Sequence, residues 1–215
     1  MEHKKLQLTP LPRLYLISSG EEPFNLGTKL LEQLKRLPPA LPCMVQIREK
    51  HLEARALFSL ALQAQKIMLP EGTLLLLNER TDIAFAVGLQ GVHLQENSLA
   101  PNRLRSFFPK LLFGKSVHSL AAARIAEETG ADYLLFGPIF DTPSKRRYGS
   151  PQGLEKLGEL CQKTSLPVFA IGGITPWNAA SCRAEGAYGV AALSIFRDST
   201  GLSETIEQFY RALYP

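Results

Sequence analysis

The chain has 215 residues, of which 45% are hydrophobic and 20% charged, with a formal net charge of +4. This composition is typical of a globular protein and argues against a disordered one, and the length suffices for a sizeable core. No apolar run approaches the roughly 20 residues that a membrane-spanning helix needs. The basic residues form no dense stripe interleaved with aromatics, so we predict neither a membrane nor a nucleic-acid partner.

The cysteines and the first residues bear on the compartment. Cys43, Cys161 and Cys182 share no metal-type spacing, and an odd number argues against a disulfide framework. Residues 1–12 are charged and lack the apolar stretch of a secretory signal, so we expect a flexible lead-in there. These features predict a protein of the reducing cytoplasm.

Short apolar runs alternate with helical patterns along the whole chain. Continuous apolar runs, rather than alternating ones, are typical of strands that are buried on both faces. In chain order, the eight candidate strands are residues 13–18, 43–48, 73–78, 91–94, 111–116, 132–137, 167–172 and 189–194.

The segments between these runs have helical signals. In residues 51–68, Leu52, Ala56, Leu60 and Gln63 fall on one predicted stripe. A glycine that ends a helix is followed by a strand three times, in residues 88–94, 130–136 and 186–192. This repetition predicts one domain over residues 1–215, a (β/α)8 barrel. A doubly wound open sheet is the alternative, but no G-x-G-x-x-G follows the first strand.

Polar side chains gather where the predicted strands end. In a barrel of this kind, chemistry collects at the carboxyl ends of the strands. The residues at these ends are Gln46, Arg48, Lys50, Asn78, Glu79, His93, Ser116, His118, Thr142, Ser144 and Lys145. We expect His93 to be packed or hydrogen-bonded rather than catalytic.

The last two strand ends indicate a phosphate site. Gly172 and Gly173 let backbone N–H groups approach a ligand closely, and the helix that follows adds the positive end of its dipole. Ser194 can add a hydroxyl from the neighbouring strand end. The alternative is that the glycine pair only eases a tight turn.

Six ordered motifs carry a family resemblance. They are "QIREK", "LNERTDIAFAVGLQGVHL", "GKSVHS", "ADYLLFGPIFDTPSK", "PVFAIGGI" and "GVAALSIF". In this order they resemble the thiamin phosphate synthase superfamily, whose members are (β/α)8 barrels. Its synthases join a hydroxymethylpyrimidine diphosphate to a thiazole phosphate and release diphosphate with the help of magnesium.

The resemblance implies roles for the residues at the strand ends. The pyrimidine diphosphate would be faced by Gln46, Arg48, Lys50 and Asn78, and the diphosphate assisted by Ser116 and Lys145. The thiazole would lie beside Thr142 and Ser144, and its phosphate would be held by Gly173 and Ser194.

The carboxylates depart from the synthase pattern. Asn78-Glu79 stands where synthases usually have Asn-Asp, and "HLQENSL" stands where they have a pattern like "HLGQDDL", which puts Ser98 at an acid position. Magnesium usually takes one or two carboxylates together with substrate phosphates. We therefore expect no metal or other cofactor, with Glu79 as the metal ligand if the chain is a synthase.

A second branch of the superfamily, the TenI-like thiazole tautomerases, resembles "FFPKLLFGKSVHSL". In that branch the histidine of "SVHS", here His118, is the acid/base that converts a carboxylated dihydrothiazole phosphate to the aromatic thiazole without a metal. Histidine suits this role because its ordinary pKa lies near 6.5. The alternative for His118 is a hydrogen-bonded residue at a corner.

The sequence thus leads us to expect a metal-independent thiazole tautomerase that binds a small phosphorylated thiazole. A thiamin phosphate synthase, with Glu79 and Glu96 forming the magnesium site, is the alternative, and a noncatalytic binder of thiazole or thiamin phosphate is a third hypothesis. The sequence leaves open whether the protein forms a homo-oligomer.

Overall fold

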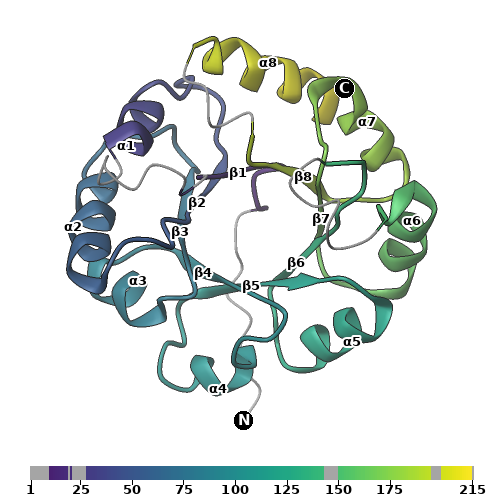
Figure 1. The fold of residues 1–215 in the computed structure, drawn as a ribbon, viewed down its shortest axis with the longest axis horizontal. Helices are drawn as coiled ribbons and strands as arrows, with labels where there is room; N and C mark the ends of the chain where they lie inside the picture. Colours follow the sequence, from purple (N-terminus) through teal and green to yellow (C-terminus); the bar gives the residue numbers. More distant parts are fainter. Residues whose placement is uncertain (1–9, 19, 21–27, 143–149, 195–199, 215) are drawn as a thin grey trace.

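Eight parallel strands form a closed ring in chain order, with β1 next to β8 (Figure 1). The structure is a computed structural model that describes residues 10–18, 20, 28–142, 150–194 and 200–214. The strands are β1 (Leu14–Ile17), β2 (Met44–Ile47), β3 (Leu74–Asn78), β4 (Gly91–Leu94), β5 (Leu112–Val117), β6 (Tyr133–Phe136), β7 (Val168–Ile171) and β8 (Gly189–Ala192).

A helix follows each strand, and the helices surround the ring (Figure 1). They are α1 (Thr28–Lys35), α2 (Ala54–Gln65), α3 (Thr81–Val87), α4 (Pro101–Arg105), α5 (Leu120–Glu128), α6 (Gly153–Lys163), α7 (Pro176–Ala184) and α8 (Leu202–Leu213). The predicted (β/α)8 barrel is confirmed, and the strand ends lie within about two residues of those predicted.

The strands read as continuous apolar runs because both of their faces are buried. Leu14 and Leu16 of β1 point outward and pack in the layer between the strands and the helices. Tyr15 and Ile17 alternate with them and point into the barrel. Leu11, in the expected lead-in, is also buried in the inner cluster.

The buried face of α2 differs from the predicted stripe. It is formed by Leu57, Leu60, Ala61 and Ala64, whereas Gln63 is exposed. Leu60 belongs to both sets. The expected stripe was wrong by about one residue. Apolar residues of this helix do not all lie on its packed face, as the exposed Phe58 shows, so the apolar pattern alone does not fix which face is buried.

Aromatic rings fill the middle of the barrel. The ring of Tyr133 lies 5.8 Å from that of Tyr15 and 5.5 Å from that of Phe169, both edge to face. The Tyr133 ring fits only because Gly114 on the adjacent strand has no side chain. A Cβ added at Gly114 would lie 2.0 Å from Cζ of Tyr133.

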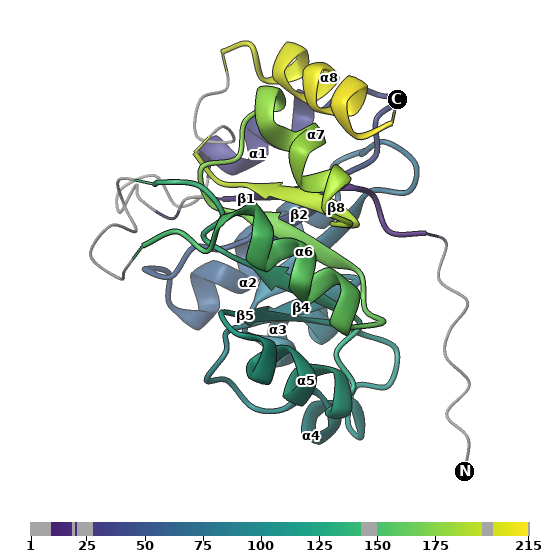
Figure 2. The same ribbon diagram turned by 90° about the vertical axis from the view of Figure 1, so that its right-hand side faces the viewer.

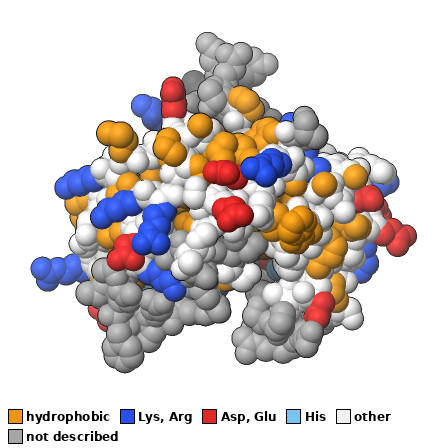
Figure 3. Space-filling model, turned by 90° about the horizontal axis from the view of Figure 1, so that it is seen from above, with side chains coloured by type: hydrophobic (Ala, Val, Ile, Leu, Met, Phe, Trp, Pro, Cys, Tyr) orange, Lys and Arg blue, Asp and Glu red, His pale blue; other side chains and the backbone are white. Residues whose placement is uncertain are grey.

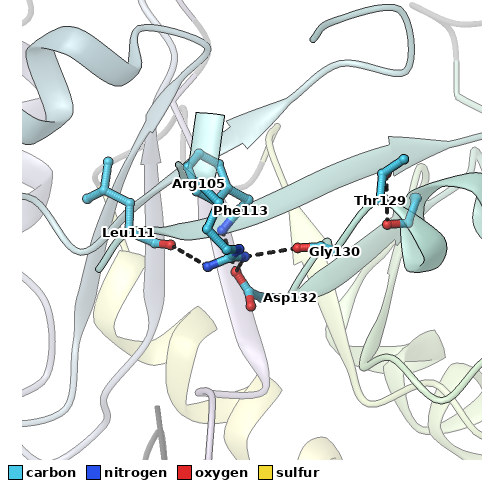
Figure 4. Close-up of polar contacts among 7 residues, drawn as sticks. Arg105, Leu111, Phe113, Thr129, Gly130 and Asp132 are labelled. Atoms are coloured by element: carbon cyan, nitrogen blue, oxygen red, sulfur yellow. Dashed lines mark hydrogen bonds and ion pairs between the residues drawn. The ribbon is translucent and has the colours of Figure 1, made fainter. Parts of the chain in front are cut away.

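An ion pair joins α4 to the amino-terminal ends of two strands (Figure 4). The guanidinium of Arg105 donates to the carboxylate of Asp132 at 2.7 Å and to the carbonyl of Gly130 at 2.9 Å. The same carboxylate accepts the backbone N–H of Phe113 at 2.7 Å, and the guanidinium lies 5.0 Å from the centre of the Phe113 ring. These contacts hold the short helix α4 against the barrel at the end opposite the predicted site.

Two expectations about partners concern the surface. In the part of the chain that the structure describes, no helix is long and apolar enough to cross a membrane. Figure 3 shows basic, acidic and hydrophobic side chains interspersed on the face seen from above, without a continuous basic stripe on that face.

Gly114→Ala is expected to lower the free energy of unfolding by about 1–3 kcal/mol, because the new methyl group overlaps the Tyr133 ring. Urea denaturation measures this change. The same substitution in a Tyr133→Leu background should cost less, because leucine lacks the atoms that clash. Equal costs in the two backgrounds would contradict this explanation of Gly114.

Candidate functional site

The carboxyl ends of all eight strands lie at one end of the barrel, on the left in Figure 2. Four of the residues predicted at the strand ends are joined there and just below by buried or partly buried hydrogen bonds. We call the connected set the interior network. Its six members, in order of their contacts, are Asn78, Gln46, Tyr15, Tyr133, His93 and Ser116.

One half of the interior network joins strands β3, β2 and β1. Gln46 Nε2 donates to Asn78 Oδ1 at 3.0 Å, and the Tyr15 hydroxyl donates to Gln46 Oε1 at 3.0 Å. Gln46 and Tyr15 are buried, and Asn78 is half-buried at the end of its strand. Asn78 therefore lies at the upper end of this row.

The other half joins β1, β6, β4 and β5. The hydroxyl oxygens of Tyr15 and Tyr133 lie 3.0 Å apart, and that of Tyr133 lies 3.2 Å from His93 Nδ1. His93 Nε2 lies 2.8 Å from Ser116 Oγ. Ser116 is half-buried, so it forms the second end of the network that is partly open to solvent.

Burial sets the protonation states within the interior network. It lowers the pKa of His93 to about 3, with a further lowering by the nearby Lys115 ammonium. Burial also raises the pKa of Tyr133 and, reinforced by Tyr133, that of Tyr15. The imidazole is therefore neutral and both phenols are protonated at neutral pH.

Glu79 lies at the rim beside the loop that follows β4. Its carboxylate accepts a hydrogen bond from Gln95 Nε2 at 2.7 Å and another from the Ser98 hydroxyl. Glu79 also adopts a left-handed backbone conformation with φ of 61°. Ser98, which stands where synthases have an acidic residue, thus contacts Glu79, the carboxylate that the synthase hypothesis requires as a metal ligand.

Lys115 points outward from β5 and anchors the same loop. Its ammonium donates to the carbonyl of Ser98 at 2.9 Å. Burial lowers the pKa of Lys115, while the carboxylates of Glu79 and Glu96 act in the opposite direction. Both carboxylates therefore lie within electrostatic range of one lysine.

Glu79 and its neighbours determine whether a magnesium ion could be held at the rim. Among the described residues, no group of three or more His, Cys, Asp or Glu side chains is placed to hold a metal. The rim offers Glu79 as one carboxylate, and Ser98 uses its hydroxyl as a donor to it. One carboxylate together with phosphate oxygens of a substrate fits the lower limit of what magnesium takes.

His118 lies just beyond the end of β5 and is exposed. Its Nδ1 lies 2.7 Å from the carbonyl oxygen of Gly137. A carbonyl can only accept, so Nδ1 carries the proton, and the neutral ring keeps its lone pair on Nε2. The arrangement fixes the tautomer that a base acting through Nε2 needs.

The glycine pair after β7 is required by close backbone packing. Gly172 and Gly173 have φ of 99° and 65°. A Cβ on Gly172 would lie 2.5 Å from Cβ of Pro138, and one on Gly173 would lie 2.8 Å from the carbonyl oxygen of Asp141. This packing explains the two glycines whether or not they also bind a phosphate.

Asn178, which the sequence reasoning missed, holds this turn against α7. Its Nδ2 donates to the carbonyl of Gly173 at 2.9 Å, and its Oδ1 accepts the backbone N–H of Thr175 at 2.8 Å. The spacing from Thr175 to Asn178 is that of a capping box, in which Glu or Gln usually takes the place that Asn178 has here. Ser194 is exposed after β8.

The remaining predicted residues are only partly located. Arg48 is half-buried after β2, where its backbone N–H donates to the Ser18 hydroxyl at 2.8 Å, and Lys50 is exposed. The Thr142 hydroxyl donates to the carbonyl of Phe140 at 3.1 Å. Ser144 and Lys145 lie outside the described residues.

Tyr15 and Tyr133 were also missed by the sequence reasoning. Each stands in a short apolar strand, "LYLI" and "YLLF", where it reads as a core residue. The available signal was that a buried tyrosine needs a hydrogen-bond partner for its hydroxyl. His93 is buried and hydrogen-bonded, as the sequence led us to expect.

The free energy of unfolding is expected to fall as the pH drops below about 6.5, the pKa of an unfolded histidine. Below that pH His93 is protonated in the unfolded chain, whereas in the folded protein it stays neutral down to about pH 3. Between about pH 6.5 and pH 3, His93 therefore lowers the free energy of unfolding by up to about 1.4 kcal/mol for each unit by which the pH falls. Above pH 6.5 it has no such effect. Chemical denaturation at pH 7.5 and pH 5 measures the difference, about 2 kcal/mol from this residue.

His93→Gln removes the titrating group, so the variant should lose less stability between pH 7.5 and pH 5 than the parent protein does. Equal losses in the two proteins would show that His93 is not the group responsible.

The chain is similar to known proteins over most of its length. A family model described as thiamine monophosphate synthase matches residues 14–196. A putative thiamine-phosphate synthase 2 of Aquifex aeolicus is 41% identical over 186 residues, covering 86% of this chain and 98% of that protein. A putative thiamine-phosphate synthase of Geobacter sulfurreducens is 42% identical over 151 residues, covering 70% of this chain and 71% of that protein.

A solved structure supports the same relationship. A thiamine phosphate pyrophosphorylase from Pyrococcus furiosus superposes with a TM-score of 0.78 at 27% sequence identity, covering 94% of this chain and 95% of that one. The names of these proteins support the synthase alternative better than the tautomerase that the sequence led us to expect. On these findings, the chain belongs to the thiamine monophosphate synthase family of thiamin-biosynthesis enzymes.

Proposed function

We propose that the protein is a thiamin phosphate synthase, which joins a hydroxymethylpyrimidine diphosphate to a thiazole phosphate. The observation that carries this proposal is the 41% identity to a protein named putative thiamine-phosphate synthase 2, over 98% of that relative's length. The rim also keeps basic and amide side chains after β2 and β3, which suit a diphosphate. The protein's partners are then two small phosphorylated molecules.

In this reaction a bond forms between the thiazole and the methylene carbon of the pyrimidine, and the bond from that carbon to the diphosphate breaks. The leaving diphosphate carries the developing negative charge. Arg48 and Lys50 follow β2 and offer positive charge to it. Gln46 and Asn78 are held by the interior network at the same edge and orient the ring or its diphosphate.

A magnesium ion, when bound, supplies further positive charge to the leaving group. Glu79 would hold it together with oxygens of the diphosphate. The hydrogen bonds from Gln95 and Ser98 fix the direction in which the Glu79 carboxylate points.

On the opposite side of the site, we assign the thiazole phosphate to the turn of Gly172 and Gly173 and to Ser194. The turn is rigid because Asn178 fixes it to the start of α7, and this helix directs its amino-terminal end toward the turn. We assign Thr142 and Ser144, which follow β6, to the thiazole and Lys145 to the diphosphate. Ser144 and Lys145 lie outside the described residues.

A thiazole tautomerase is the second candidate, and the geometry of His118 favours it. The Gly137 carbonyl holds the ring in the tautomer with Nε2 free, so the ring can accept a proton there and return it to a neighbouring atom of the bound thiazole. Ser98 in place of an acid also favours a reaction without a metal.

Turnover with each substrate set, with and without a chelator, separates the two candidates. A synthase couples the pyrimidine diphosphate to the thiazole phosphate only with magnesium, and Glu79→Gln should lower this activity at least about 100-fold by removing the carboxylate that would hold the metal. Ser98→Asp, which restores a second carboxylate, should lower the magnesium concentration needed for half-maximal activity.

A tautomerase instead aromatises the dihydrothiazole in the presence of the chelator, and His118→Ala should slow it about 10²–10⁴-fold. Aromatisation without coupling would overturn the synthase proposal in favour of the second candidate. Binding of the thiazole phosphate without either reaction would leave a noncatalytic binder.

A further inference from the structure

The two phenols of the interior network each carry a single proton, because burial keeps both hydroxyls un-ionised. Each hydroxyl can therefore donate one hydrogen bond only. The hydroxyl of Tyr15 contacts two partners, Gln46 and Tyr133, and the hydroxyl of Tyr133 contacts Tyr15 and His93. Each phenol must consequently donate to one of its partners and accept from the other.

The direction of every bond follows from the Gln46 end. Tyr15 donates its proton to Gln46 Oε1, so Tyr133 must donate to Tyr15. His93 must then donate from Nδ1 to the Tyr133 oxygen. The neutral His93 ring consequently has its lone pair on Nε2, and Ser116 must donate to it.

We propose that Tyr15, Tyr133 and His93 are positioning residues that give the two open ends of the interior network opposite hydrogen-bonding characters. At one end, Asn78 accepts from Gln46 and turns its amide N–H groups toward the site. At the other end, the Ser116 hydroxyl donates its one proton to His93, so it can only accept a hydrogen bond from a ligand. The site thus receives acceptor groups of a ligand, such as phosphate oxygens, at Asn78 and donor groups at Ser116. On this proposal Ser116 does not donate to the diphosphate, contrary to the role that the resemblance implied.

The two ends are coupled, since no single bond can reverse alone. A ligand that made Ser116 donate would leave His93 Nε2 without a proton partner unless His93 took the other tautomer. Tyr133 and Tyr15 would then have to turn their hydroxyls, and Gln46 would have to present its amide nitrogen to Tyr15. An unsatisfied buried polar group costs about 1–3 kcal/mol, so a mixed state is disfavoured.

The tautomer of His93 reports the direction of the whole network. Long-range ¹H–¹⁵N NMR of the full-length protein labelled with ¹⁵N-histidine distinguishes a ring nitrogen that bears a proton from one that does not. The chain has four histidines, and the His93→Gln spectrum identifies the signals of His93. At neutral pH we expect a neutral His93 with its proton on Nδ1. The experiment needs no substrate, so its result stands apart from that of the turnover assays.

Tyr15→Phe tests the coupling, because the Tyr15 hydroxyl is linked to His93 through Tyr133. Without the Tyr15 oxygen, the Tyr133 hydroxyl loses its acceptor and turns to His93 Nδ1. We expect the proton of His93 to move to Nε2. Gln46→Met should produce the same switch from one residue further away. Without the Gln46 oxygen, Tyr15 donates to Tyr133, and Tyr133 then donates to His93 Nδ1. This variant tests the coupling if Tyr15→Phe does not fold.

Tyr188→Phe is the matched control. The Tyr188 ring packs 5.5 Å from Phe169 in the same inner cluster, and its hydroxyl donates to the carbonyl of Leu11, outside the interior network. This variant should keep the proton on Nδ1. A parental His93 protonated on Nε2 or on both nitrogens, or a tautomer that is unchanged in both Tyr15→Phe and Gln46→Met, would overturn the proposal.

Discussion

The structure depends on the requirement that polar groups buried inside an eight-stranded barrel find partners among themselves. The strands bring inward-facing side chains within reach of one another, and water cannot replace a missing partner there. Among the described residues, no buried side-chain nitrogen or oxygen lacks a hydrogen bond. The interior network meets this requirement with side chains from six strands, from Asn78 to Ser116. Asn78 and Ser116, at the two ends of the network, are therefore held in place by hydrogen bonds to buried side chains.

Much of the fold was predictable from the sequence because parallel strands buried on both faces read as unbroken apolar runs. The same property hid the interior network. Tyr15 and Tyr133 look like core residues in a linear pattern, and only the ring closure shows that their hydroxyls meet. Gly114 carried no signal for the same reason, since its role is to leave space for a side chain on the next strand.

The candidate site was predictable as a set of positions but not as a set of interactions. The predicted strand ends brought Gln46, Asn78 and Ser116 to one end of the barrel, and the structure adds that one network joins them. The sequence suggested that Ser98 removes a ligand, whereas the structure shows that it also bonds to Glu79. This contact joins two loops separated along the chain, which spacing alone does not reveal.

The close packing of the turn at Gly172 and Gly173 against residues 138–141 has a consequence for which residues can be replaced. Any side chain at Gly172 would collide with Pro138, and backbone bonds from Ile139 to Ile171 and from Phe140 to Gly172 keep the two segments together. Replacement of Gly172 by a larger residue therefore requires the backbone at Pro138 to move. Ile139 and Phe140, by contrast, are held through backbone N–H groups that any residue except proline supplies, so their side chains can change without loss of these two bonds.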